Sequence, residues 1–172
     1  MQLYRLTLSG IGPFAAQQKI DFTKLTQDGL FLLTGQTGAG KSTIIDAVVF
    51  ALYGDVAGGE ESDKSRLVST FRGDSEPVVE LIFETAAGLF KVRRTPAYER
   101  QRARGTGTTT QNATCKVWRM IDIDQEGEDA YSGIQEANQV LGRAIGLTKD
   151  QFTQTVVLPQ GKFAAFLRTT PD

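Results

Sequence analysis

The sequence predicts an α/β domain in which a mixed sheet with an antiparallel segment packs with helices. Three observations predict this class. A glycine-rich G-x-x-x-x-G-K-S motif at residues 35–42 stands between an apolar run and a longer amphipathic run. Two runs rich in β-branched and apolar residues flank a turn at residues 85–88. From Gly133 onward, apolar residues recur with the spacing of a helix.

The composition is that of an ordinary globular protein of 172 residues, the length of one domain. The net charge is −1, so a nucleic-acid site would have to be a local patch. Cys115 is the only cysteine, which excludes an internal disulfide, and the lack of histidine excludes histidine catalysis within this chain. No apolar run is long enough to span a bilayer and no signal peptide opens the chain, so we expect a cytoplasmic protein without a membrane partner.

The amino-terminal third is expected to form strands followed by a strand–loop–helix unit. Residues 2–9 alternate as a strand does, and residues 18–22 form a second short strand that pairs with it. Residues 29–34 form a buried strand, and the helix after the motif ends at Gly54. Together these last elements make a P-loop strand and helix over residues 29–54.

The remaining chain is expected to contain an antiparallel segment and then helices. Within residues 76–123, strands at 77–84 and 89–94 form a hairpin, 95–113 is a long linker, and 114–123 is a third strand. Ser132 is the predicted N-cap of a helix that Gly146 ends. Three further short elements are expected to follow: a turn at 148–152, a strand running into a loop at 155–161, and another helix from 162.

The motif at residues 35–42 is a P-loop by residue type and spacing. Its glycines permit a tight loop whose N–H groups approach phosphate oxygens, and the following helix points its positive end at the same anion. Lys41 is predicted to contact the β- and γ-phosphates, Ser42 to ligate Mg²⁺, and Thr43 to reach the α-phosphate. The predicted nucleotide-binding residues here are Gly35, Gln36, Thr37, Gly38, Ala39, Gly40, Lys41, Ser42 and Thr43.

A complete nucleoside triphosphatase also needs an acidic residue for Mg²⁺ and a group that positions water. Asp122 and Glu84 each end a strand-like run, but both are better interpreted as solvated strand ends. Residues 148–150 differ in spacing from the guanine-reading T-K-x-D motif. The chain is therefore either an unusual P-loop protein or part of one.

A basic stretch begins in the second strand of the predicted hairpin and continues into the linker. Its cations are Lys91, Arg93, Arg94, Arg100, Arg102 and Arg104, against one acid, Glu99. Clustered arginines on a loop suit sequence-independent contact with DNA phosphates, whereas charges along a strand edge also protect it from aggregation. The residues alone leave both interpretations open.

Three segments together resemble the amino-terminal part of the SbcC family, a group of SMC-like ATPases within the ABC superclass. They are the first strand pair, the run T-G-Q-T-G-A-G-K-S-T that starts at Thr34, and the run Q-F-T-Q-T-V-V-L-P-Q-G-K-F-A-A-F-L that starts at Gln151. The resemblance implies that residues 1–172 are the amino-terminal half of an ATPase head, the N-terminal lobe of an ABC-type P-loop fold. A coiled coil and a carboxyl-terminal half that bears the catalytic acids and signature motif would then lie outside this chain.

The resemblance also implies roles for particular residues and partners. Lys41 and Gln160, the Q-loop glutamine, would be catalytic; Ser42 and Gln160 would face Mg²⁺; Arg66 and Val68 would lie near the base or ribose of ATP. DNA contact is implied for Arg94, Arg100, Arg102 and Arg104. The implied partners are the carboxyl-terminal half of the head, a second head, an SbcD-type nuclease subunit and double-stranded DNA.

The expected function is therefore ATP-driven head dimerisation that controls a partner nuclease, with little activity in this chain alone. Two alternatives belong to other classes. One is a self-sufficient small kinase or GTPase that uses Asp122 or Glu84 for Mg²⁺. The other is a DNA-binding assembly module in which nucleotide is only a structural ligand.

Overall fold

The computed structural model describes residues 1–25, 33–57, 67–102 and 106–155. The elements in chain order are β1 (Gln2–Ser9), β2 (Gln18–Asp21), α1 (Phe22–Leu25), α2 (Lys41–Tyr53), β3 (Val78–Thr85), β4 (Gly88–Thr95), β5 (Tyr98–Gln101), β6 (Thr108–Gln111), β7 (Thr114–Asp122), β8 (Gln125–Ser132), α3 (Ile134–Ile145) and α4 (Lys149–Thr155). The described part is thus an α/β fold, as predicted.

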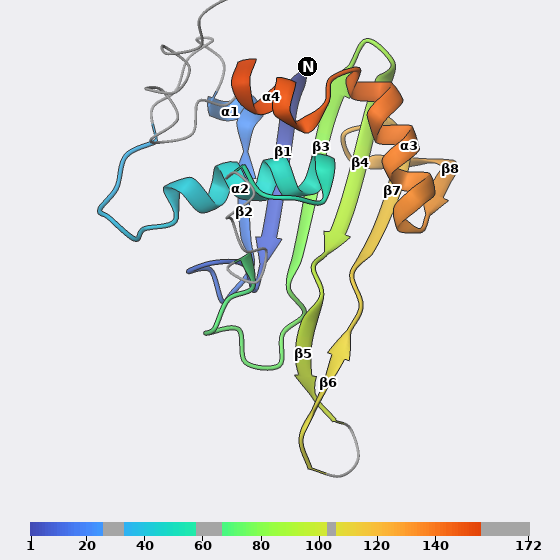
Figure 1. The fold of residues 1–172 in the computed structure, drawn as a ribbon. Helices are drawn as coiled ribbons and strands as arrows, with labels where there is room; N and C mark the ends of the chain where they lie inside the picture. Colours follow the sequence, from blue (N-terminus) through green and yellow to red (C-terminus); the bar gives the residue numbers. More distant parts are fainter. Residues whose placement is uncertain (26–32, 58–66, 103–105, 156–172) are drawn as a thin grey trace, which may run out of the picture.

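Six of the strands form one sheet in the order β2-β1-β3-β4-β7-β8, while β5 and β6 pair as a separate ribbon. Every pairing among the described strands is antiparallel. The predicted strand pair β1–β2, the hairpin β3–β4 and the third strand β7 are confirmed. The ribbon extends beyond the ends of β4 and β7, away from the helices (Figure 1).

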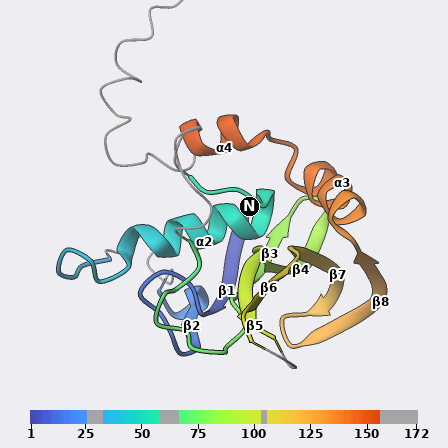
Figure 2. The ribbon, with the colours of Figure 1, turned by 60° about the horizontal axis from the view of Figure 1, so that its bottom comes forward.

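The core lies between one face of this sheet and the helices α2, α3 and α4, which all cover the same side (Figure 2). Alternation along the strands places every second side chain on that face. The register aligns Leu6, Leu81 and Val92 in one row across three strands. Each of these side chains is fully buried, so the core is built where the period-two pattern of the sheet meets the apolar helix surfaces.

The opposite face of the sheet carries charged side chains and ion pairs. Arg93 bonds Glu80 at 2.9 Å and Glu76 at 3.1 Å, and Lys91 bonds Glu126 at 2.9 Å. The β7–β8 hairpin also curls back over this face, because Asp124 at its turn bonds Arg5 on β1 at 2.8 Å. These partly exposed ion pairs make this side of the sheet more polar than the core face.

Several elements differ from the sequence-based expectations. The predicted linker 95–113 contains the ribbon strands β5 and β6, and β8 was not expected because its side chains are mostly polar and exposed. The N-cap of α3 is Gly133, at φ 101°, and not Ser132, while Gly146 ends the helix as predicted. Thr155 belongs to helix α4, so the strand expected from 155 does not begin there; residues 156–172 lie outside the described residues.

The predicted strand at 29–34 is described only at its end. Residues 29–32 lie outside the described residues, and Leu33 and Thr34 are irregular, with Leu33 43% exposed. The sheet was predicted to be mixed because it would contain this strand beside the antiparallel ones. Since most of the strand lies outside the described residues, the mixed sheet stays a prediction. No helix in the described ranges is long and apolar enough to cross a membrane.

Candidate functional site

The predicted P-loop forms an exposed turn that leads directly into α2. Gly38 and Gly40 have φ values of 84° and 91°, and the N–H of Ala39 donates to the carbonyl of Gln36 at 3.2 Å. Positive φ is readily adopted by glycine, which explains why this residue type stands at these two positions. A Cβ built on Gly38 would have no atom of the described residues within 4 Å, so the described part of the chain leaves this side of the loop open.

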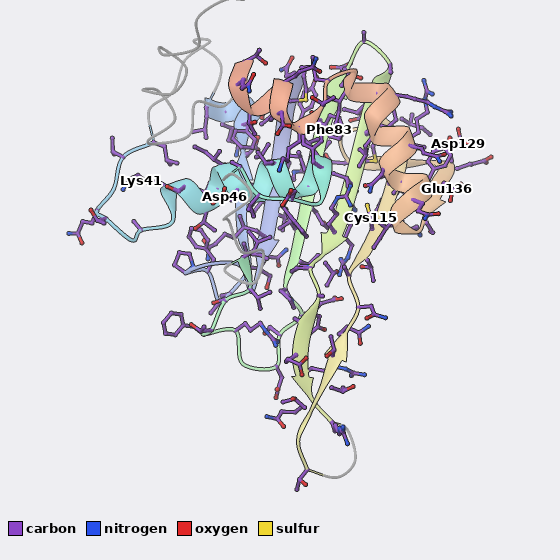
Figure 3. The ribbon with its side chains drawn as sticks, in the orientation of Figure 1. Lys41, Asp46, Phe83, Cys115, Asp129 and Glu136 are labelled. Carbon is purple, nitrogen blue, oxygen red and sulfur yellow. The ribbon has the colours of Figure 1, made fainter. Side chains whose placement is uncertain are left out.

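The side chain of Lys41 folds over this loop from the first residue of α2. Its Nζ donates to the carbonyl of Gly35 at 2.6 Å and to that of Gln36 at 2.7 Å. The ammonium group therefore lies on the loop itself, where phosphate oxygens would be bound. Figure 3 shows Lys41 at the end of α2 that projects past the sheet, with Asp46 farther along the helix.

The residue types around the loop fit a nucleoside triphosphate with Mg²⁺. The first turn of α2 contains no acidic residue that would repel an anion, and Ser42 at its second position is exposed. Unpaired N–H groups at the start of a helix and a nearby ammonium group are the donors that phosphate requires. No group of three acidic, cysteine or histidine side chains that could hold a metal is found among the described residues.

The loop at residues 10–14 braces the P-loop from beside the sheet. A Cβ on Gly40 would lie 2.5 Å from the Cζ atom of Phe14, and a Cβ on Gly12 would lie 2.6 Å from Cγ2 of Thr43. Gly12 and Gly40 thus permit close approach of backbone to side chain at the start of α2. Sequence reasoning did not find this contact, although the run G-I-G-P-F before a P-loop carries the glycine that it requires.

The same loop connects the P-loop to the segment around Val68. The N–H of Gly12 donates to the carbonyl of Leu67 at 2.8 Å, and the N–H of Ser69 donates to the carbonyl of Gly10 at 2.9 Å. Val68 forms a bridge with Ile11. Val68 is thereby tied through one loop to the first turn of α2, while Arg66 lies outside the described residues.

Asp46, in the second turn of α2, contacts the chain that follows the helix. Its Oδ1 atom accepts a hydrogen bond from the N–H of Ala57 at 3.1 Å. Burial raises the pKa of this carboxyl above its ordinary value, although the Ala57 hydrogen bond opposes the change. The carboxylate is therefore used in holding the chain after α2.

The other end of α2 contacts Arg94, which does not behave as the predicted DNA contact. Arg94 is only 3% exposed, and its register with Val79 and Cys115 puts it on the core face of the sheet. Its Nε donates to the carbonyl of Ala51 at 2.7 Å. Because its guanidinium group is buried beneath a helix, Arg94 is a structural residue; the prediction counted its charge but not the face of β4 on which it lies.

Two other predicted basic residues lie on or beside the exposed ribbon β5–β6. Arg100 is exposed on β5, and Arg102 donates from Nε to the carbonyl of Thr108 at 3.0 Å. Glu99, on the opposite face of the ribbon, accepts a hydrogen bond from the Thr110 hydroxyl. Threonine hydroxyls hold the pKa of Glu99 below its ordinary value, so it stays anionic. Arg104 lies outside the described residues.

Helix α4 packs against the carboxyl-terminal end of α2. The ring of Phe152 lies 5.5 Å from that of Tyr53, and Lys149 pairs with Asp55 at 2.7 Å. These contacts fix the point from which the chain continues toward Gln160. Gln160 itself lies outside the described residues.

The two acids considered for a self-contained site lie on strands of the sheet. Glu84 accepts a hydrogen bond from the Tyr4 hydroxyl at 2.6 Å and is opposite Gln2 in the register. Asp122 is exposed where β7 turns into β8 and is opposite Gln125. Both are strand-end residues, as interpreted from the sequence, and within the described ranges no contact joins them to the P-loop.

Comparisons with known proteins agree with the resemblance found in the sequence. A family model described as an AAA domain matches residues 5–172. The chain is 35% identical over 170 residues to the SbcC subunit of the SbcCD nuclease of Vibrio cholerae, a match that covers 97% of this chain and 16% of that protein. It is 35% identical over 169 residues to the protein of the same name from Clostridium acetobutylicum, covering 98% of this chain and 14% of that protein.

Among solved structures, the chain resembles an SMC head domain from Thermotoga maritima with a TM-score of 0.39 and 26% identity. That likeness covers 64% of this chain and 36% of the other. The resemblance to SbcC proteins is confirmed by the curated relatives. This chain spans only 14–16% of the length of the two curated relatives above.

Proposed function

The chain belongs to the AAA domain family, and from this premise we propose that it is the ATP- and Mg²⁺-binding half of an SbcC-type ATPase head. The observation that carries the proposal is the position of Lys41, whose Nζ atom lies 2.6 Å from the Gly35 carbonyl oxygen and 2.7 Å from that of Gln36. An ammonium group beside a glycine loop at a helix start supplies the positive charge that, with the free N–H groups of the helix, suits phosphate.

Each residue of the P-loop and of the segment tied to it has a role in the proposal. Gly35, Gln36, Thr37, Gly38, Ala39 and Gly40 offer backbone N–H groups to the phosphates, Lys41 neutralises their charge, and Thr43 binds the α-phosphate. Ser42 would hold Mg²⁺, which when bound shields the negative charge of the phosphates. Val68, tied to Thr43 through Gly12, is suited to contact the ribose or base, with Arg66 beside it in sequence.

We propose Gln160 as the residue that faces Mg²⁺ and the attacking water. An amide can accept and donate hydrogen bonds at once, which suits that position. Gln160 follows Thr155, the last residue of α4, by five positions, a reach of at most about 17 Å. Helix α2 has 13 residues and is about 20 Å long, so a chain that starts near its carboxyl-terminal end can cover most of the distance to Lys41.

The remaining partners follow from the same assignment. We propose that residues 1–172 are joined by a coiled coil to a carboxyl-terminal half with the catalytic acids, and that two such heads clamp ATP between them. ATP binding would then control an SbcD-type nuclease subunit that acts on double-stranded DNA in the cytoplasm. The curated relatives, each named as the SbcC subunit of a nuclease, support this assignment. The kinase and GTPase alternative lacks support, since no contact among the described residues links Asp122 or Glu84 to the loop.

DNA contact is proposed for the ribbon β5–β6 and not for Arg94. Arg100 and Arg102 share one face, where Arg72 also stacks over Tyr98 at 4.6 Å, while Glu99 lies on the other face. This separation leaves a cationic face suited to phosphates, with Arg104 expected nearby. A ribbon without a core of its own is also only marginally stable, so it is suited to gain order on binding.

Nucleotide binding tests the first part of the proposal. Lys41→Ala should weaken binding of a fluorescent ATP analogue at least tenfold, whereas Lys19→Ala, which removes an exposed lysine on β2, should leave it unchanged. The purified 172-residue chain should turn over ATP negligibly, because the proposal places the catalytic acids in the carboxyl-terminal half of the head. Steady turnover that Lys41→Ala abolishes would show instead a self-sufficient enzyme.

Charge reversal tests the ribbon. The double change Arg100→Glu and Arg102→Glu should lower DNA affinity and reduce the slope of log affinity against log salt by about one unit for each phosphate that the protein no longer neutralises. Lys19→Glu with Arg143→Glu alters the net charge equally at two other exposed positions. Equal losses of affinity in the two double variants would mean that net charge, and not the ribbon, governs binding.

A further inference from the structure

Arg94 is a buried cation in a place where the sheet otherwise carries apolar side chains. It occupies one row of the core face with Leu8, Val79 and Cys115. Burial lowers the pKa of its guanidinium group from the ordinary value. Among the described residues, no carboxylate pairs with it. A buried charge is costly unless hydrogen bonds satisfy it, so the partners of Arg94 indicate what it stabilises.

Those partners are the last turn of α2 and one residue of α3. Nε donates to the carbonyl of Ala51 at 2.7 Å, and Nη2 donates to the carbonyl of Leu52 at 3.4 Å and to Oδ1 of Asn138. The final carbonyls of a helix have no partners inside it and form its negative end. A guanidinium group satisfies several of them at once, which a lysine could not do with the same geometry.

The chain just after α2 is shaped to admit this guanidinium group. Gly54 ends the helix at φ 70°, and its N–H donates to the carbonyl of Phe50 at 2.8 Å. A Cβ at Gly54 would lie 3.0 Å from Nη1 of Arg94. The glycine thus permits both the left-handed cap and the close approach of the arginine.

The position of this contact matters because the fully buried residues of α2 lie toward the end that Arg94 contacts. Residues 47–52 are buried, whereas Ser42 and Ile45 near the P-loop are exposed. A helix is stiff, so the direction of the end that carries Lys41 depends on the Arg94 contacts at the far end as well as on the loop at residues 10–14. Through Asn138, the same guanidinium group also ties α2 to α3, which leads into α4.

We infer that Arg94 is a positioning residue of the phosphate site: it aligns the P-loop helix α2 with α3 and α4 by bonding the Ala51 and Leu52 carbonyls and Asn138. This inference rests on the proposed ATP binding. When nucleotide binds at the P-loop and orders α2, the hydrogen bond of Arg94 to Asn138 also makes α3 more ordered. Asn138 is the exposed half of this link, so it can be changed without opening the core.

Hydrogen exchange of the full-length protein, with and without a non-hydrolysable ATP analogue and Mg²⁺, tests the link. In the wild type, nucleotide should slow exchange of amides in residues 35–50 and in residues 134–155. In Asn138→Ala, the protection of 35–50 should remain and that of 134–155 should fall at least threefold. Asn138→Asp keeps the acceptor oxygen and should restore it, and Gln139→Ala, an exposed neighbour on α3, should behave as the wild type.

The outcomes separate the two proposals. The inference alone is overturned if nucleotide still protects residues 134–155 from exchange in Asn138→Ala. It is also overturned if nucleotide protects the P-loop of the wild type but not residues 134–155. A wild type in which nucleotide protects neither segment overturns the proposed ATP binding, and the inference with it. Two further results would indicate a general loss of stability and would also overturn the inference. One is faster exchange of both segments in Asn138→Ala without nucleotide, and the other is an equal effect of Gln139→Ala and Asn138→Ala.

Discussion

The ring of Phe14 lies directly against the backbone of Gly40, the residue that precedes helix α2. A Cβ on Gly40 would be 2.5 Å from Cζ and 2.7 Å from Cε2 of Phe14. Gly40 also has φ 91°, so both its backbone conformation and its surroundings require glycine. The start of helix α2 is therefore positioned by an aromatic residue from the loop after β1.

This contact predicts different effects for two similar substitutions. Gly38→Ala should lower the free energy of unfolding by about 1–2 kcal/mol, the cost of a left-handed backbone, because the space around it is open. Gly40→Ala should lose about 1–3 kcal/mol more through overpacking against Phe14. Urea denaturation of both variants measures the difference, and equal losses would mean that the loop moves aside freely.

The carboxyl of Asp46 predicts a change of stability with pH. Its pKa is raised in the folded state, so its contribution to stability is complete below the unfolded value near 3.8 and decreases as pH rises through the folded value. Asp46→Asn keeps an acceptor for the Ala57 N–H and does not titrate. The variant should match or exceed the wild type at pH 7, with the difference vanishing at acid pH, in thermal unfolding measured from pH 3 to 7.

Tyr53 predicts a corresponding effect at alkaline pH. Burial raises the pKa of its hydroxyl from 10.0 to about 12, and that hydroxyl donates to the Leu147 carbonyl at 3.2 Å. Its contribution is present below pH 10 and is lost as pH rises toward and through 12. Tyr53→Phe should remove this part of the alkaline decline, and an unchanged profile between pH 10 and 12 would contradict the assignment.

Phe152 is the residue on which the packing of α4 depends. It is 2% exposed and meets the Tyr53 ring. Phe152→Ala should cost about 3–5 kcal/mol through the lost burial and the remaining cavity. Leu147→Ala, at a residue 38% exposed in the segment before α4, should cost less than about 1 kcal/mol. Similar losses in the two variants would show that α4 contributes little to the core.

Local sequence patterns determined much of this fold correctly. The period-two runs gave β1, β3, β4 and β7, and the glycine at 146 gave the end of α3, because both signals depend on neighbouring residues alone. Strand β8 was missed since it is a polar edge strand, held by its pairing with β7 and not by an apolar face. The ribbon β5–β6 was missed for the same reason.

In the candidate site, too, the parts defined by neighbouring residues were predicted correctly, and those defined by tertiary contacts were not. The P-loop was evident from residue types at fixed spacing, and the structure brings the Lys41 ammonium group onto that loop. Arg94 was assigned to the wrong role because a sequence gives the charge of a residue but not the face of the strand that carries it. Its neighbours Ala51 and Asn138 are more than 40 residues away in either direction.

The sequence by itself determined the P-loop motif, the class of the fold and the family resemblance, because each depends on residue types close together in the chain. Only the tertiary structure decided which residues hold that motif in place. Phe14, Thr43 and Gly12 meet at one end of α2, and Arg94 meets the other, through contacts between segments far apart in sequence. Such contacts form only when the sheet and helices pack, since burial and register select them.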